Sequence, residues 1–277
     1  MPQNEFQGDS TKESLTIQAG LLSRLSVGQR LSKLNHLNKA VKSLALAGLR
    51  RSNPDLGTEA VQRLYNLQQL GVELVDKEEE SEMELGSEDL NEVLKDVAAM
   101  LATLSVPYFV TGSVASSSLG VPRSTLDIDL VADFSAKSLE GLYKALGDRF
   151  YFETEAIKKA YRDNKSFNVI HLPSALKVDF FFPRRQPYAQ VALNRRQLIE
   201  IDLDGDSRKV YFSTPEDLIL SKLDWFRQGG RVSEKQWLDI LGLLRVQQGK
   251  LDLAFLRKWA AELGVEDLFE KALEEVS

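Results

Sequence analysis

The sequence lacks cysteine altogether and has only two histidines among its 277 residues. Without cysteine the chain can form no disulfide, no thiolate metal site and no cysteine nucleophile, which is compatible with a reducing compartment. Two histidines are too few for a histidine-rich zinc site. No apolar run reaches the roughly 18 residues that a membrane span needs, and the polar start MPQNEFQGDSTKES is unlike a secretion signal. We therefore expect a cytoplasmic protein with no membrane partner.

The charges of the chain are unevenly distributed. The net charge is −6, but residues 71–90 hold nine acids and one lysine, a net of −8, and −6 minus −8 leaves +2 for the rest. Like charges at this density repel one another and resist burial, so we interpret the segment as a solvated linker. The predicted parts are a helical arm with a disordered start over 1–72, the acidic linker over 73–87, an α/β domain over 88–213 and a helical domain over 214–277.

The arm has apolar residues at helical spacing over 13–72, interrupted at Pro54 and Gly57. Two short helices around such a turn allow two interpretations. One is a helical arm used for packing or dimerisation. The other is a DNA-binding regulator that uses residues 35–70. The neighbouring acidic segment disfavours the second interpretation, because DNA is itself anionic.

Helices and strands alternate beyond the acidic segment. An amphipathic helix is predicted over 88–104, and Thr214 with Pro215 starts another helix that three more follow. Alternating or β-branched and aromatic residues predict strands over 107–112, 126–134, 166–172, 176–182 and 209–213. The predicted fold class is α/β (α+β), with a mixed-sheet domain, a C-terminal helical domain and the N-terminal helical arm.

Two aspartates stand on one face of a predicted strand. In LDIDLVADF, Asp127 and Asp129 are two residues apart, so their side chains point the same way and their Cα atoms lie about 6.5 Å apart. Asp179, at the centre of the apolar strand LKVDFFF, joins them if the two strands are neighbours. The alternatives are charges that protect an edge strand and, for Asp179, an ion pair with Lys177.

Three carboxylates placed in this way favour a hard cation. Mg²⁺ or Mn²⁺ relieves their mutual repulsion, and a pair of such ions suits phosphoryl or nucleotidyl transfer. In this hypothesis Asp127 and Asp129 bind both ions, while Asp179 binds one and helps to activate the nucleophile. Gly112 at a strand end lets a triphosphate approach the backbone, and Ser113 offers a hydroxyl and N–H groups at a helix start.

These motifs carry a resemblance to a known superfamily. TGS at 111–113, DID at 127–129 and TPEDLILSKL from Thr214 resemble the DNA polymerase β-like nucleotidyltransferases, and GVPRSTLDIDL is similar to the abortive-infection (AbiE-type) toxin members. The resemblance covers about 100–245. It implies transfer of a nucleoside monophosphate from a nucleoside triphosphate such as ATP to a hydroxyl of RNA, tRNA, protein or a small molecule. It also implies a toxin with an antitoxin partner.

The resemblance further implies that Lys222 holds the triphosphate. Its neighbours on the helix surface are Leu218, Ile219 and Phe226. An ammonium on such an apolar stripe needs an anion, unless its stem packs and its charge reaches water. Arg123 is a further candidate for phosphate contact, or else is solvated or bonded to nearby carbonyls. For Asp239 the choice is between a substrate role and a helix cap or internal salt bridge.

A second hypothesis keeps the fold without the chemistry. In it the chain is a catalytically silent nucleotide-binding or scaffold protein. The presence of all three carboxylates favours the enzyme over this alternative.

Overall fold

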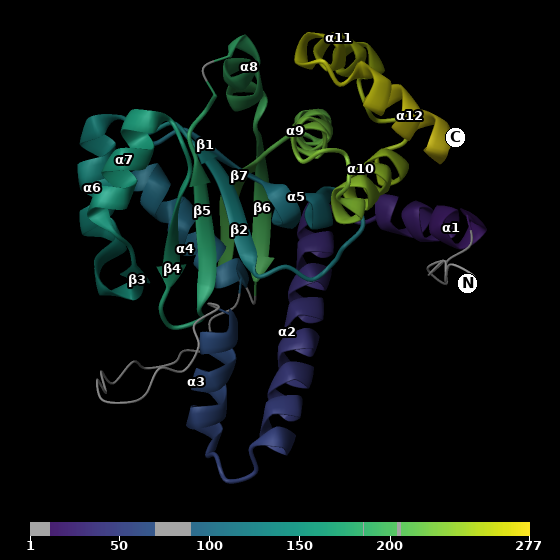
Figure 1. The fold of residues 1–277 in the computed structure, drawn as a ribbon. Coiled ribbons are helices and arrows are strands. Elements are labelled where there is room, and N and C mark those ends of the chain that lie inside the picture. The colour runs from purple at the N-terminus through teal and green to yellow at the C-terminus, as the bar shows by residue number, and fades with distance from the viewer. Residues whose placement is uncertain (1–11, 70–89, 185, 204–205) are drawn as a thin grey trace. The chain divides into compact units, whose positions relative to one another are not determined.

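The computed structural model describes residues 12–69, 90–184, 186–203 and 206–277 (Figure 1). The described chain divides into two compact units. A sheet unit comprises the described parts of Leu31–Ala115 and Arg123–Thr214, and a helical unit comprises the described parts of Met1–Arg30, Ser116–Pro122 and Pro215–Ser277. The predicted acidic linker over 73–87 and the start of the arm lie outside the described residues, and the predicted domain boundaries stay predictions.

The sheet unit is built on a mixed sheet whose described strands number seven, in the order β3-β4-β5-β2-β1-β7-β6. Its strands are β1 (Tyr108–Thr111), β2 (Asp127–Ala132), β3 (Phe150–Tyr151), β4 (Phe167–His171), β5 (Leu176–Phe181), β6 (Gln197–Leu203) and β7 (Asp206–Phe212). The β1–β7 and β2–β5 pairs are parallel, and the other pairs are antiparallel. The predicted mixed α/β class is confirmed.

The sheet unit also contains helices. Those that lie wholly or partly in the sheet unit are α2 (Val27–Ser52), α3 (Thr58–Gln69), α4 (Leu90–Thr103), α5 (Gly112–Leu119), α6 (Ala136–Leu146), the 3₁₀ turn η1 (Gly147–Arg149), α7 (Thr154–Asp163) and α8 (Pro187–Arg195). Helix α4 packs on β7 and α6, and α7 packs on β4. The chain passes from one unit to the other within α2 and within α5.

Side-chain alternation gives the two central strands β2 and β5 a buried and a partly open face. Ile128, Leu130 and their register partners Val178 and Phe180 are fully buried. The alternate positions on both strands are exposed or half-buried. An apolar strand side in the core and a polar side toward solvent is the pattern that period-two sequences produce.

One end of the open face is covered. Phe109 of β1 is the register partner of Val131 on β2, and it packs with Ala192 and Leu193 of α8. The adjacent polar positions of β2 lie beyond this apolar cluster. Helix α8 therefore closes one end of the face and leaves the carboxylate positions outside the apolar core.

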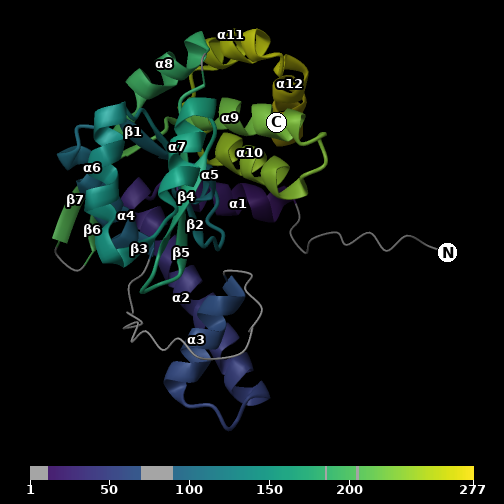
Figure 2. The same cartoon turned by 60° about the vertical axis from the view of Figure 1, so that its left-hand side comes forward.

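Helices α2 and α3 form an antiparallel hairpin (Figures 1 and 2). The ammonium of Lys42 on α2 lies 5.8 Å from the centre of the Tyr65 ring on α3, a cation–π contact between them. The predicted helical arm is thus confirmed as helical over its described part. Neither its predicted use in packing or dimerisation nor its use in DNA binding is tested by this arrangement.

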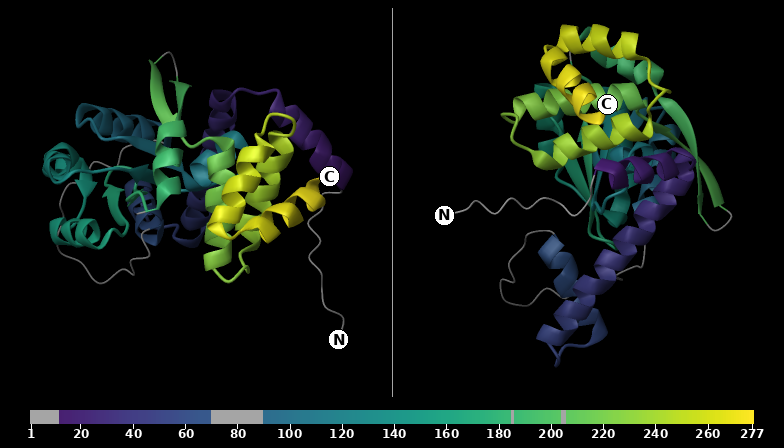
Figure 3. Two further views of the ribbon diagram at one scale, coloured as in Figure 1. Left: turned by 90° about the horizontal axis from the view of Figure 1, so that it is seen from above. Right: turned by 90° about the vertical axis from the view of Figure 1, so that its right-hand side faces the viewer.

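The helical unit gathers α1 (Lys12–Ser23), α9 (Pro215–Gln228), α10 (Glu234–Val246), α11 (Leu253–Leu263) and α12 (Glu266–Val276). Helix α10 packs against α9, α12 and α1, and α11 lies against α9 and α12 (Figure 3). Side chains of Ser233 and Asp252 cap α10 and α11 by accepting backbone N–H groups. Within the described ranges, every helix is too short or too polar to span a lipid bilayer.

Candidate active site

Two aspartates from distant parts of the chain lie next to each other across the β2–β5 pair. Asp129 is the register partner of Asp179, and Asp127 is the partner of Lys177. Paired strands lie about 4.8 Å apart, so the side chains of partners on one face are neighbours. Residues two apart share a face, and the three predicted carboxylates therefore stand on the same face of the sheet. The predicted condition that the two strands be adjacent is met.

Gly112 makes room for one of these carboxylates. Its φ is +62°, in the left-handed region that favours glycine. A Cβ at this position would overlap the Asp129 carboxylate, its nearest neighbour. Two features therefore explain why glycine occupies this position: the backbone turn at the end of β1 and the close approach of Asp129.

Ser113 begins the next turn beside the same carboxylate. Its backbone N–H lies 3.4 Å from Asp129 Oδ2, and its hydroxyl accepts a 2.7 Å hydrogen bond from Nη2 of Arg123. Nη1 of the same guanidinium lies 3.5 Å from the Ser124 carbonyl. Four of the predicted site residues, Gly112, Ser113, Arg123 and Asp129, are thus joined in one small region of the sheet unit.

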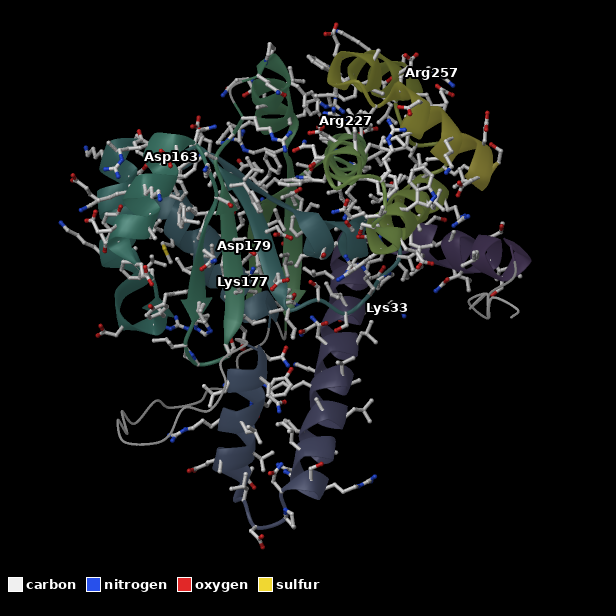
Figure 4. The ribbon with its side chains drawn as sticks, viewed as in Figure 1. Lys33, Asp163, Lys177, Asp179, Arg227 and Arg257 are labelled. Carbon is white, nitrogen blue, oxygen red and sulfur yellow. The ribbon has the colours of Figure 1, made fainter. Side chains whose placement is uncertain are left out.

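Lys177 supplies a positive charge to the carboxylate face. Its Nζ lies 2.8 Å from Asp179 Oδ2, and the two side chains lie together on β5 (Figure 4). The aspartate side chain is 16% exposed and the lysine 42%. Burial acts to lower the pKa of Lys177, but the hydrogen bond and charge of Asp179 outweigh it and raise this pKa. The charges of Asp127 and Asp129 act in the same direction.

The donor set fits a divalent cation in its chemistry. Carboxylate oxygens are the ligands that Mg²⁺ and Mn²⁺ prefer, and the ammonium of Lys177 already marks the face as one that attracts positive charge. Across the described ranges, no three carboxylates or histidines converge closely enough to hold an ion as they stand. Binding therefore requires rotation of these side chains and displacement of Lys177 from Asp179, and the cofactor stays a prediction.

Comparisons with known proteins place the fold in context. No family model matches the chain, and no curated protein is similar to it. Nine chains of solved structures are similar, among them the following three. An antigenic nucleotidyltransferase-like protein from Paracoccidioides brasiliensis is 18% identical, with a TM-score of 0.40 over 69% of this chain and 94% of that one.

Two further similar structures are an antibiotic-resistance factor and an antibiotic adenylyltransferase. The antibiotic-resistance factor ANT(2'')-Ia is 15% identical, with a TM-score of 0.37 over 65% of this chain and 91% of its own. The lincosamide antibiotic adenylyltransferase LnuA, in its lincomycin-bound form, is 15% identical, with a TM-score of 0.34 over 54% and 93%. Similarities this remote assign no activity, which has to be argued from the site itself.

Lys222 belongs to the helical unit, on α9. Its Nζ lies 2.8 Å from Oδ2 of Asp239 on α10, and the two side chains are only 10% and 5% exposed. The anion that the apolar stripe requires is therefore present within the protein. For Asp239 the structure contains the internal salt bridge that was one of the two alternatives. The predicted contact between Lys222 and a triphosphate stays a prediction.

One polar neighbour of the site was not predicted. Asn168 of β4 is the register partner of Asp179 on the side away from β2, and it is exposed. The alternation in SFNVIHL predicts that Asn168 points away from the core. Only the strand order, which a single sequence does not specify, places it beside a carboxylate.

Proposed function

We propose that the chain is a nucleotidyltransferase that moves a nucleoside monophosphate from a nucleoside triphosphate to a hydroxyl acceptor with the help of Mg²⁺ or Mn²⁺. The observation that carries the proposal is the register of Asp129 and Asp179, with Asp127 on the same face and the Gly112–Ser113 turn at its edge. A carboxylate face beside a helix start combines groups that suit cations with groups that suit phosphate.

The reaction in this proposal is an in-line displacement. The acceptor oxygen forms a bond to the α-phosphorus, the bond from that phosphorus to the bridging oxygen breaks, and pyrophosphate leaves with the electron pair. Asp127 and Asp129 would hold the cations, and Asp179 would hold one and help to activate the attacking hydroxyl by accepting its proton. When bound, the cations neutralise phosphate charge and lower the pKa of the hydroxyl.

The remaining residues bind and orient the triphosphate. The backbone of Gly112, which has no side chain, and the N–H of Ser113 lie beside the Asp129 carboxylate. Arg123, already bonded to the Ser113 hydroxyl, adds a planar donor that suits phosphate oxygens. Lys222, on α9 of the helical unit, stays the further triphosphate ligand that the sequence resemblance implies.

A second candidate function rests on a specific contact. Lys177 neutralises Asp179 through an ion pair within the chain, and such a pair would let a silent nucleotide-binding or scaffold protein of this fold keep this carboxylate. A thermal-shift measurement with Mn²⁺ and each nucleoside triphosphate separates the candidates when it is combined with turnover. Stabilisation without turnover favours the silent protein.

The experiment that tests the enzyme follows the label of α-³²P nucleoside triphosphates. Each of the four ribonucleotides is incubated with the protein, Mg²⁺ or Mn²⁺, and total RNA, lysate protein or a small-molecule fraction. The double variant Asp127→Ala, Asp129→Ala is the blank, and Asp163→Ala, an exposed aspartate on α7 (Figure 4), is the matched control. We expect label in one fraction, lost in the blank and kept in the control.

The fraction that takes the label names the acceptor class. Label in tRNA or protein agrees with the toxin role that the sequence resemblance implies, and a search for an antitoxin partner then follows. Label that persists in the double variant contradicts the proposed mechanism, because the two aspartates would then be dispensable.

A further inference from the structure

A buried asparagine of the N-terminal arm is bonded to the segment that precedes β2. Asn38 on α2 donates from Nδ2 to the Thr125 carbonyl at 2.9 Å. Its Oδ1 accepts the Thr125 N–H at 3.0 Å and the Ser124 hydroxyl at 2.9 Å. Asn38 is 9% exposed and Thr125 is 7% exposed. All of these residues belong to the sheet unit.

The side chain of Asn38 does for Thr125 what a neighbouring strand does in a sheet. It satisfies both the N–H and the C=O of one residue, although residues 123–126 belong to no helix or strand. Buried backbone groups that lack a partner cost free energy, so this segment depends on an external donor and acceptor. The bonds join residues that are 87 positions apart in the chain.

The segment that Asn38 holds carries two of the predicted site residues. Arg123, two residues before Thr125, donates to the Ser113 hydroxyl, and Asp127, two residues after it, begins β2. Fixing the backbone of Thr125 therefore restricts where the guanidinium and the first carboxylate can lie.

We propose that Asn38 is a positioning residue for the nucleotidyl transfer, and that helix α2 is part of the machinery of the site rather than an appended arm. The proposal rests on the proposed function. It extends the site to a region that the sequence resemblance leaves out, since that resemblance covers only about 100–245.

The chemistry of the contact dictates the test variant. Asparagine presents one acceptor and one donor, whereas aspartate presents two acceptors and cannot donate to the Thr125 carbonyl. Asn38→Asp therefore keeps the size and breaks one half of the contact, and Asn38→Leu breaks both halves. Asn53→Asp is the matched control, because the Asn53 side chain donates to the Leu49 carbonyl four residues earlier, directly after the end of the same helix.

Two readouts apply to each variant. The first is hydrogen exchange of the Thr125 amide, which is bonded directly to Asn38. The second is the kinetics of label transfer, with kcat and KM for the triphosphate determined separately and the folded fraction checked by urea unfolding. In Asn38→Asp we expect exchange at Thr125 to rise at least about tenfold, and kcat/KM to fall about 10- to 100-fold while the folded fraction is unchanged. Asn53→Asp should match the wild type in both.

Each outcome bears on the proposal. Unchanged exchange at Thr125, or a loss of transfer that only follows the loss of folded protein across both Asn38 variants, overturns it. If the wild type transfers no label, the proposed function fails. The hydrogen-exchange data and the affinities for Mn²⁺ and triphosphate then decide separately whether Asn38 is a positioning residue. Such a role still predicts weaker binding in Asn38→Asp and unchanged binding in Asn53→Asp.

Discussion

Lys177 and Asp179 form an ion pair, Nζ to Oδ2 2.8 Å, on a strand that also aligns Asp179 with Asp129. The lysine thus gives the carboxylate face a cation of its own. A divalent ion has to compete with this ammonium for Asp179, and the strength of that competition affects how tightly the ion binds.

Replacing Lys177 by methionine should tighten the binding of Mn²⁺. The substitution keeps an unbranched side chain, one atom shorter, and removes the competing charge, and we expect the dissociation constant to fall about tenfold, which corresponds to about 1.4 kcal/mol. Isothermal titration calorimetry of the protein with Mn²⁺ alone measures it. Lys158→Met is the control, because Lys158 pairs with Glu155 at the same 2.8 Å on α7. Equal or weaker binding in Lys177→Met would show that the lysine does not compete.

Gly112→Ala should displace the carboxylate of Asp129. The new methyl group overlaps that carboxylate, and the left-handed backbone itself costs about 1–2 kcal/mol for a residue with a Cβ. Gly264→Ala isolates the cost of the left-handed backbone, since Gly264 has φ +67° and open space where its Cβ would lie. We expect both variants to lose stability in urea, and only Gly112→Ala to lose Mn²⁺ affinity. Similar Mn²⁺ affinities in the two variants would argue against a role for this close approach.

His171 is a buried histidine held in the neutral form. Its Nε2 accepts from Nη2 of Arg149 at 3.3 Å, which leaves the proton on Nδ1, 2.7 Å from the Ser174 hydroxyl. Burial, aided by the positive charge of Arg149 and opposed by Asp96, lowers the pKa of His171 from 6.5 to about 4.

The stability of the protein should therefore fall between pH 6.5 and pH 4. In this window the unfolded chain binds a proton at His171 and the folded chain does not, so unfolding is favoured as the pH decreases. Urea unfolding midpoints at pH 7, 6 and 5 measure the slope of stability against pH. We expect a shallower slope in His171→Gln and an unchanged one in the control His36→Gln, whose histidine is exposed. A slope that His171→Gln leaves intact would assign the pH dependence to other groups.

Breaking the buried pair of Lys222 and Asp239 should be costly. Asp239→Asn leaves a buried ammonium without its charge partner. In such pairs this lowers the free energy of unfolding by about 3–5 kcal/mol. The double variant Lys222→Met, Asp239→Leu should recover most of that stability. If Lys222 also binds the triphosphate, the double variant should be stable but bind the nucleotide more weakly, as measured by calorimetry. Wild-type nucleotide affinity in that variant would show that the pair is purely structural.

The sequence predicts the strands that carry the site better than the helices between them. The predicted strand over 126–134 is β2 over Asp127–Ala132, and 176–182 is β5 over Leu176–Phe181. Both have strong period-two patterns. The prediction omits helices α6 to α8 and strands β3 and β6, although α6 and α7 are amphipathic and IEIDL in β6 alternates with period two.

Pairing between strands limits what a sequence alone can say about the site. The alternation in LDIDLVADF predicts that Asp127 and Asp129 share a face, and this much depends only on local geometry. The alignment of Asp129 with Asp179 depends on the β2–β5 register, and the bond from Asn38 to Thr125 depends on tertiary packing of α2. The ion pair of Lys177 and Asp179 was foreseen as an alternative because two residues on one strand face are always close.

The parallel pairing of β2 with β5 also sets an order of events during synthesis. Asp129 leaves the ribosome well before its register partner Asp179, and at about 5–20 residues per second the delay is a matter of seconds. Until then the first two carboxylates lack both the third one and the ammonium of Lys177. The nascent chain therefore has no complete carboxylate face, and cation binding by the protein should arise only after β5 has emerged and paired.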